Sequence, residues 1–132
     1  GLRLLRAKNV MKMPPFLVNV GEDPAGVKHR MEEAGLRWAM LVEDGDRFLG
    51  WVTCDDIVES KSIREIITPP TVTATEDTPL NEALSLMLSS AIGTLAVLDD
   101  QERLIGVLSF DIIRDVLGED VDAEAGCKED VS

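Results

Sequence analysis

The sequence predicts a mixed α/β (α+β) protein built from two β-α-β-β-α repeats that pack on each other with pseudo-two-fold symmetry. The main observation is an internal duplication, in which two octapeptides share one order of glycine, apolar, hydroxyl and acidic residues. They are Gly50-Trp51-Val52-Thr53-Cys54-Asp55-Asp56-Ile57 and Gly106-Val107-Leu108-Ser109-Phe110-Asp111-Ile112-Ile113. Such a repeat indicates one structural unit used twice. A unit of about 55 residues builds only a marginal core, so we expect the halves to share buried surface.

The duplication extends upstream with an apparent change of register. The Pro-Pro pairs at positions 14–15 and 69–70 are separated by 55 positions, whereas Gly50 and Gly106 are separated by 56. We therefore expect that one residue was inserted or lost inside a repeat. A residue before proline avoids helical geometry, so each Pro-Pro pair predicts an extended start to its repeat.

The second repeat has the clearer secondary-structure pattern. We expect a strand at 71–74, a helix running to Leu88, strands at 95–98 and 104–108 around a polar hairpin turn, and a final helix at 111–117. Asp77 and Pro79 are typical of a helix start, and the apolar residues after them recur at helical spacing. Ser109 is expected to cap the last helix, and Gly118 to end it.

The first repeat follows the same order. We expect a helix opened by Asp23 through Ala34, strands at 38–42 and 48–52, and a helix at 55–59 capped by Thr53. The Asp-Gly pair in the turn at 43–46 favours a tight hairpin. A leading helix at 2–7 would join the repeats to an N-terminal neighbour. The predicted organisation is a linker helix at 1–9, repeats at 10–60 and 61–118, and an acidic disordered tail at 119–132.

Composition excludes several classes of protein. With 132 residues, 45% apolar and 29% charged, the chain is typical of a soluble globular protein. A net charge of −12 argues against nucleic-acid binding. No apolar run reaches the about 20 residues of a transmembrane helix. Cys54 and Cys127 fit neither a disulfide framework nor a metal site, which indicates a reducing, cytoplasmic setting. His29 is the single histidine, and no nucleophile with a base is evident, so we expect no enzyme.

The tandem units, each with a proline-rich start and a closing Gly-x-x-Thr/Ser-x-x-Asp pattern, resemble a pair of CBS domains, the regulatory modules named for cystathionine β-synthase. The resemblance covers about residues 8 to 118. The triplet at 50–52 and a Leu-rich lead-in are similar to the C-terminal CBS pairs of ATP-binding subunits of glycine betaine, carnitine or choline ABC transporters.

This resemblance implies an adenine-nucleotide sensor that regulates an ABC transporter ATPase for compatible solutes, and so a role in osmoregulation. It also implies a homodimer at the cytoplasmic face of the membrane, with the ATPase domain N-terminal to this region and membrane contact only through the host complex. The alternative is a ligand-free dimerisation module, in a transporter or another host, whose charged tail senses ionic strength.

The chemistry of the repeated pattern is that of a nucleotide site. A glycine lets a ligand approach the backbone, while a following hydroxyl and the first helix amides can hold a phosphate. An Asp one helical turn later suits the hydroxyls of a ribose. Gly50, Thr53 and Asp56 fit this arrangement. In the second copy Ser109 is followed by Asp111 one position early, so that site is predicted to have lost ribose recognition.

The resemblance further implies that an adenine lies between apolar strands, near Phe16-Leu17 and Thr71-Val72. The regulatory ligands considered are ATP, ADP, AMP, S-adenosylmethionine and cyclic di-AMP, with no required cofactor and no metal. Arg37 and Arg114 are candidate cations for a phosphate. A purely structural interpretation also stands, in which the hydroxyls are helix caps and the glycines serve strand packing.

Overall fold

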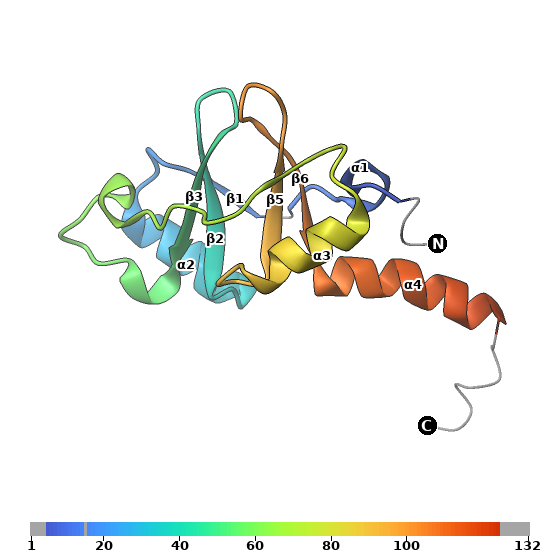
Figure 1. Cartoon of the computed structure of the whole chain (residues 1–132). Coiled ribbons are helices and arrows are strands. Elements are labelled where there is room, and N and C mark those ends of the chain that lie inside the picture. The colour runs from blue at the N-terminus through green and yellow to red at the C-terminus, as the bar shows by residue number, and fades with distance from the viewer. Residues whose placement is uncertain (1–4, 15, 125–132) are drawn as a thin grey trace.

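The computed structural model describes residues 5–14 and 16–124, and it contains two three-stranded sheets that lie side by side (Figure 1). The first sheet consists of β1 (Leu17–Asn19), β2 (Trp38–Glu43) and β3 (Arg47–Thr53), and the second of β4 (Ala74–Thr75), β5 (Thr94–Leu98) and β6 (Leu104–Ser109). In each sheet the first strand is parallel to the second, and the third returns antiparallel through a hairpin. The predicted α/β fold is confirmed.

The helical elements are α1 (Ala7–Val10), α2 (Pro24–Ala34), η2 (Cys54–Asp56), η3 (Ile63–Ile66), α3 (Leu80–Leu88) and α4 (Phe110–Glu124). Asp23 caps α2 as expected, because its carboxylate accepts a 3.0 Å hydrogen bond from the Gly26 amide. The predicted end of the last helix at Gly118 is wrong, since α4 continues through it to Glu124. Cys127 and the rest of the predicted tail, 125–132, lie outside the described residues.

No helix within the described ranges has both the length and the apolar character needed to cross a membrane.

The two repeats share one constant offset of 56 residues, so the expected insertion is wrong. Val18 pairs with Leu41 in the first sheet, and Ala74 pairs with Val97 in the second. The equivalent helix positions, 31 and 87, are both buried methionines. Strand register is fixed by which side chains face the core, whereas the prolines lie before the strands and are free of that constraint. The Pro-Pro pairs are therefore one residue out of structural register.

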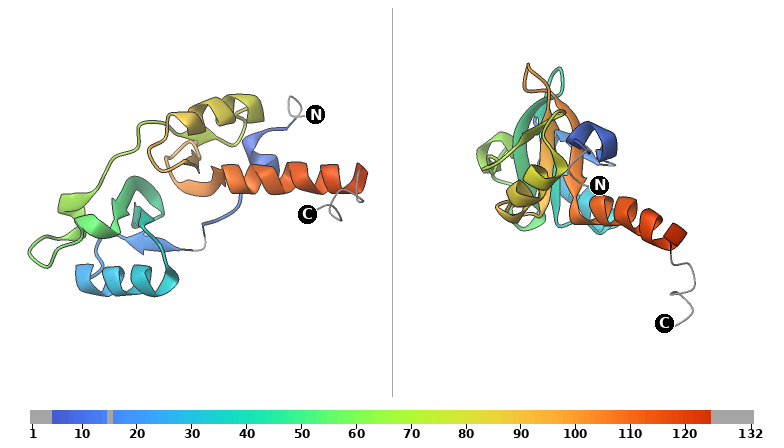
Figure 2. Two further views of the ribbon diagram at one scale, coloured as in Figure 1. Left: turned by 90° about the horizontal axis from the view of Figure 1, so that it is seen from below. Right: turned by 45° about the vertical axis from the view of Figure 1, so that its right-hand side comes forward.

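Each repeat opens with a short helical turn that packs on the other repeat. α1 and η3 are equivalent at the same offset, and both have a capping box, in which the Arg6 amide donates to Asn9 (2.8 Å) and the Ser62 amide to Glu65 (2.7 Å). Ala7 lies in the core of the second repeat, beside α4 (Figure 2). The helix predicted at 2–7 is thus wrong for residues 5 and 6, and 1–4 lie outside the described residues.

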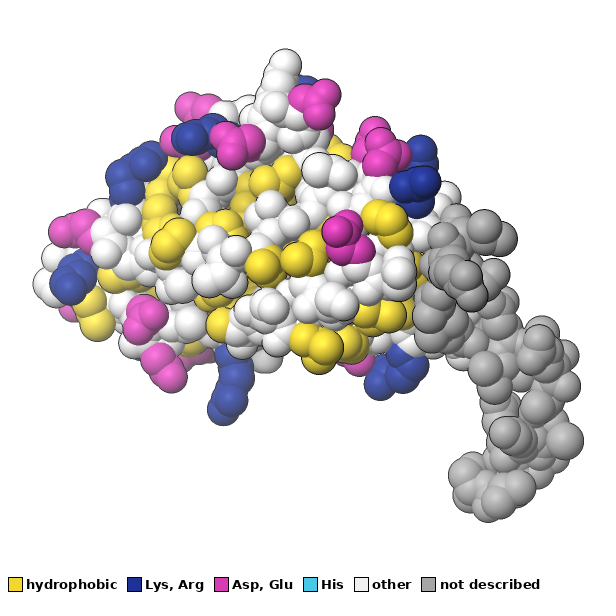
Figure 3. All heavy atoms as spheres, in the orientation of Figure 1, with side chains coloured by type: hydrophobic (Ala, Val, Ile, Leu, Met, Phe, Trp, Pro, Cys, Tyr) yellow, Lys and Arg dark blue, Asp and Glu magenta, His cyan; other side chains and the backbone are white. Residues whose placement is uncertain are grey.

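A third core joins the two sheets, as the small size of each repeat predicts. It contains apolar residues from both sheets, namely Met40, Val42, Phe48, Ala96, Leu104 and Val107. The hairpins meet above it through two symmetric backbone hydrogen bonds, from Phe48 to Glu102 (3.0 Å) and from Leu104 to Asp46 (2.9 Å). On the face shown in Figure 3, hydrophobic side chains run in a band across the middle, with an acidic side chain among them, and most of the charged side chains lie toward the edge.

Candidate functional site

The candidate site lies where β3 ends beside the start of β2. Thr53, the last residue of β3, is the backbone partner of Trp38, the first residue of β2. A pocket of 410 Å³ opens at this end of the sheet. It is lined by Leu36, Arg37, Trp38, Thr53, Cys54 and Asp55. The predicted hydroxyl and the candidate cation Arg37 are therefore brought together, although 16 positions separate them in the sequence.

The helix expected after Thr53 is not formed, and this changes the site. The chain makes only the three-residue 3₁₀ turn η2, and the Thr53 side chain makes no cap hydrogen bond to it. Ile57 is 3% exposed and anchors the segment in the first core, but the polar residues 60–62 offer no apolar side chain for a second helical turn. As a result Asp55 lines the pocket, whereas Asp56, at the end of the turn, does not, and both side chains are exposed.

The equivalent hydroxyl of the second repeat is used differently. Ser109 accepts a 3.1 Å hydrogen bond from the Ile112 amide and caps α4, as predicted. Asp111 is exposed and forms an ion pair with Arg114 at 3.0 Å on the same helix. Both polar side chains of this copy are engaged within α4, which is what the structural interpretation expects.

The space beside each of the two repeated glycines is occupied by another segment of the chain. Gly50 has φ 135°, and a Cβ there would lie 2.2 Å from the carbonyl oxygen of Thr68. A Cβ on Gly106 would lie 2.8 Å from the sulfur of Met11. The segments before each repeat cross the sheets at these points, so the space predicted for a ligand beside each glycine is filled by the chain itself.

The residues predicted to contact an adenine lie in separate places. Leu17 packs at the edge of the core between the repeats, together with Trp38. Phe16 packs instead against the core of the first repeat, with the Arg30 guanidinium 4.9 Å from its ring centroid. A second pocket, of 290 Å³, involves Thr71 and Val72. It is lined by Phe48, Pro70, Thr71, Val72, Thr73, Leu98 and Glu102.

Four pocket residues were not predicted as ligand contacts: Leu36, Trp38, Cys54 and Asp55. Each is a direct chain neighbour of a residue that had been singled out. Once β2 and β3 are recognised as a hairpin, the pairing of their ends indicates that both neighbourhoods share one edge of the sheet. Within the described residues, no cluster of His, Cys, Asp and Glu side chains could hold a metal ion.

Two carboxyl groups with a lowered pKa lie away from this pocket, at the hairpins. A hydrogen bond from Arg47 lowers the pKa of Glu43, and Arg64, 3.4 Å away, adds to the effect. In the second repeat, the backbone amide and the guanidinium of Arg103 lower the pKa of Asp99. These ion pairs lie at the surface of the turns, and because both carboxyl pKa values are lowered, the stability that the pairs contribute is lost as the pH falls.

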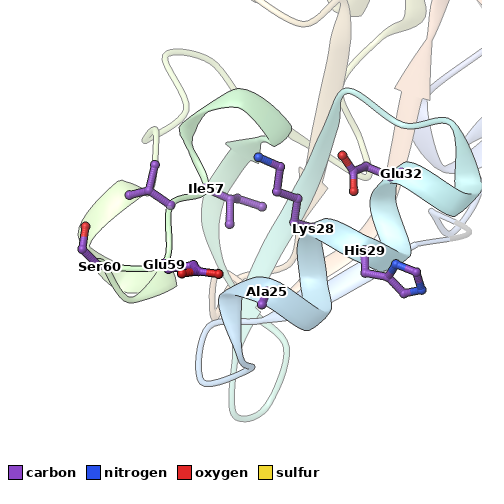
Figure 4. Close-up of a pocket in the computed structure, with 8 residues that line it drawn as sticks. Ala25, Lys28, His29, Glu32, Ile57, Glu59 and Ser60 are labelled. Atoms are coloured by element: carbon purple, nitrogen blue, oxygen red, sulfur yellow. The ribbon is translucent and has the colours of Figure 1, made fainter.

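A further pocket, of 530 Å³, lies between α2 and the loop at 57–60 (Figure 4). Lys28 extends over its Ile57 side, and Glu59 points toward the helix from the opposite wall. His29 turns outward, where it lies 3.2 Å from Glu33. The lining combines both signs of charge with a small apolar floor, and it contains none of the residues predicted to bind a ligand.

Comparison with known proteins gives the family. A family model described as CBS domain matches residues 7–62 and again residues 63–119. An uncharacterized protein of Methanopyrus kandleri, MK0525, is 29% identical over 105 residues, which are 72% of this chain and 54% of that protein. Inosine-5'-monophosphate dehydrogenase of Methanocaldococcus jannaschii is 31% identical over 91 residues, 66% of this chain and 18% of the enzyme. The chain thus spans about half, or less, of these curated relatives.

Solved structures share the fold at low identity. CbpB in complex with c-di-AMP has a TM-score of 0.82 at 12% identity, covering 94% of this chain and 91% of that one. CBSX2 in complex with AMP has a TM-score of 0.73 at 19% identity, with 87% and 98% covered. The CBS domain pair of MJ0100, with 5'-methylthioadenosine and S-adenosyl-L-methionine, has a TM-score of 0.68 at 22% identity, with 88% and 98% covered. Staphylococcus aureus OpuCA has a TM-score of 0.70 at 22% identity, with 84% and 97% covered.

Proposed function

The chain belongs to the CBS domain family, and from that premise we propose that it senses an adenine nucleotide at the pocket beside Thr53. A CBS pair is a regulatory, ligand-binding module rather than a catalytic domain. Its effect would therefore be exerted on a neighbouring domain or subunit. Binding that favours one arrangement of the two repeats over another would shift the population of that arrangement.

One observation carries the proposal: the equivalent hydroxyls of the two repeats are in different states. Ser109 caps α4, whereas the Thr53 hydroxyl makes no cap bond and lines a pocket. A hydroxyl that is left free at the start of a helical turn can donate to a phosphate oxygen, and the adjacent backbone amides can do the same. This favours the first repeat as the binding half.

The other lining residues suit the remaining parts of a nucleotide. The Arg37 guanidinium is exposed beside Thr53 and can bind a phosphate with two parallel hydrogen bonds. Trp38 is half-buried and offers an aromatic face to a purine. Asp55, in the place predicted for Asp56, is the carboxylate that could accept hydrogen bonds from ribose hydroxyls.

Adenine is the base that we propose, because the three similar structures described with ligands hold AMP, c-di-AMP, or S-adenosyl-L-methionine with 5'-methylthioadenosine. All of these contain an adenine. A single guanidinium in the pocket favours a ligand with few phosphate charges, so we place AMP before ATP for this chain.

For the host, we propose an ABC transporter ATPase for compatible solutes, with this region acting as a homodimer at the cytoplasmic face of the membrane. Support comes from the resemblance of the triplet at 50–52 and of the Leu-rich lead-in to transporter ATP-binding subunits. The second candidate is the ligand-free dimerisation module. The engaged Ser109 and Asp111 and the filled space beside both glycines favour it for the second repeat.

A thermal-shift titration with AMP, ATP, S-adenosylmethionine and cyclic di-AMP tests the proposal. We expect a saturating rise in Tm with at least one of them, since a ligand that binds only the folded state stabilises it. Arg37→Gln and Thr53→Val should weaken that ligand at least about tenfold, equivalent to about 1.4 kcal/mol. The matched control is Arg114→Gln, which removes another exposed arginine, one that is paired with Asp111 on α4. No shift with any ligand would favour the ligand-free module, whereas an equal loss in the control would refute the pocket beside Thr53 as the binding site.

A further inference from the structure

The N-terminal strap, which we define as residues 5–12, makes its contacts with the second repeat. Backbone hydrogen bonds join Ala7 to Thr78 (2.8 Å), Lys8 to Glu76 (3.0 Å) and Leu80 to Leu5 (2.9 Å). Lys12 and Val107 exchange both of their backbone hydrogen bonds, at 3.1 and 2.8 Å. Every described backbone hydrogen bond that leaves the strap therefore ends on the second repeat, even though the strap is joined covalently to the first.

The strap is held by apolar and charged contacts as well. Ala7 and Val10 belong to the core of the second repeat, and Met11 fills the space that Gly106 leaves open on β6. The strap carries three basic residues and no acidic one, in a chain with a net charge of −12. Its Lys8 pairs with Asp77 at 3.3 Å. The groove on the second repeat thus recognises this segment by backbone pairing, shape and charge.

The connection between the strap and β1 is short. Met13 is 56% exposed. Pro14 and Pro15 follow it in the sequence, and neither has a backbone N–H with which to bind a sheet. Such a hinge can turn the strap away from its own groove without the loss of any described hydrogen bond within the first repeat.

The other repeat is completed differently. The first repeat is completed by the segment at 61–68, which is equivalent to the N-terminal strap at the offset of 56. This second strap contains η3, with Ile63 in the first core, and its Thr68 exchanges two backbone hydrogen bonds with Trp51. That strap follows the first repeat directly in the chain, so the first repeat is continuous from 16 to 68. The second repeat is discontinuous, because it depends on a segment from the far end of the sequence.

From this asymmetry we propose that the groove on the second repeat also accepts the strap of a second copy, which gives a strap-swapped homodimer. The contacts would be the same as in the monomer, so the equilibrium between monomer and swapped dimer depends on protein concentration and on the hinge. A short tether gives an effective concentration in the millimolar range, so a protein concentration of about 0.1 mM should swap about a tenth of the chains. This inference does not depend on nucleotide binding.

A disulfide between separate chains tests the swap. One chain carries Lys12→Cys and the other Val107→Cys, both with Cys54→Ser and Cys127→Ser. Residues that exchange both hydrogen bonds across an antiparallel pair have Cα atoms about 5.5 Å apart, within disulfide reach. The two chains are refolded together at about 0.1 mM and oxidised. Their masses are then measured by mass spectrometry under non-reducing conditions. We expect a disulfide-linked heterodimer, and the fraction of chains in it should fall about a hundredfold when refolding is done at about 1 μM.

Two controls make each outcome decisive. Lys28→Cys, a partly exposed lysine on α2, replaces Lys12→Cys as the matched partner and should give no heterodimer above background. One chain carrying both Lys12→Cys and Val107→Cys should form the internal disulfide at any concentration. If the internal disulfide forms and the heterodimer does not, the swap is refuted. If the internal disulfide also fails, the docking of the strap on β6 is itself contradicted, and the proposal falls with it.

Discussion

Alanine in place of each repeated glycine should have unequal costs, even though Gly50 and Gly106 are equivalent by sequence. At Gly50 the new Cβ would lie 2.2 Å from the Thr68 carbonyl oxygen, at a φ of 135°. Backbone cannot move aside as a side chain can. The Thr68 segment would be displaced, with its hydrogen bonds of 3.0 and 2.8 Å to Trp51.

The expected loss in the free energy of unfolding for Gly50→Ala has two parts, the lost hydrogen bonds and the strained backbone. Loss of two backbone hydrogen bonds costs about 1–3 kcal/mol. Holding a non-glycine residue in this backbone region costs a further 1–3 kcal/mol or so. We therefore expect Gly50→Ala to lower the free energy of unfolding by about 2–6 kcal/mol. At Gly106 the obstacle is the flexible Met11 side chain, 2.8 Å away, and overpacking of that kind costs about 1–3 kcal/mol, at the low end where the side chain can move aside.

Urea denaturation of both variants and the wild type, followed by circular dichroism, measures the difference. The m-value should remain unchanged if the variants alter stability rather than the extent of unfolding. Equal losses in the two variants, or a loss at Gly50→Ala below about 0.5 kcal/mol, would refute the role assigned to the crossing straps.

Other predictions concern the caps, the core and the ion pairs. Ser109→Ala should cost about 1 kcal/mol in urea denaturation because a helix cap is lost, whereas Thr53→Ala, which removes no cap bond, should stay within about 0.5 kcal/mol. Met31→Ala should cost about 2–5 kcal/mol in the same assay, since that side chain is fully buried. Arg47 lowers the folded-state pKa of Glu43, so the contribution of this carboxylate is complete above its unfolded pKa and lost as the pH falls through the folded value. Wild type should therefore exceed Glu43→Gln in Tm near neutral pH, and the difference should vanish in acid; a difference that grows in acid would contradict this.

The candidate site could be predicted in part. Thr53 and Arg37 were singled out from the sequence, and both line the same pocket. The role of Asp56 depended on a full helix after Thr53, and that helix is absent because Ile57 is followed only by exposed residues, at 58–62. A local pattern indicates that a helical turn starts, but its length is fixed by how many apolar residues find a buried place.

The role of Gly50 and Gly106 also could not be predicted from the local sequence pattern alone. Their repetition marked them as necessary, and the two reasons considered were ligand approach and strand packing. The packing partners, Thr68 and Met11, come from segments 18 positions after Gly50 and 95 positions before Gly106. No local pattern connects residues at such separations, so the partners become evident only when the sheets are assembled.

By itself the sequence determined the repeat and the order of its strands, because these follow from local periodicity and residue type. Only the tertiary structure decided the uniform offset of 56, the exchange of straps between the repeats, and the different use of Thr53 and Ser109. The physical reason is that these depend on which buried surfaces meet. That choice is made by contacts between residues far apart in the chain, and it overrides the preferences of each segment alone.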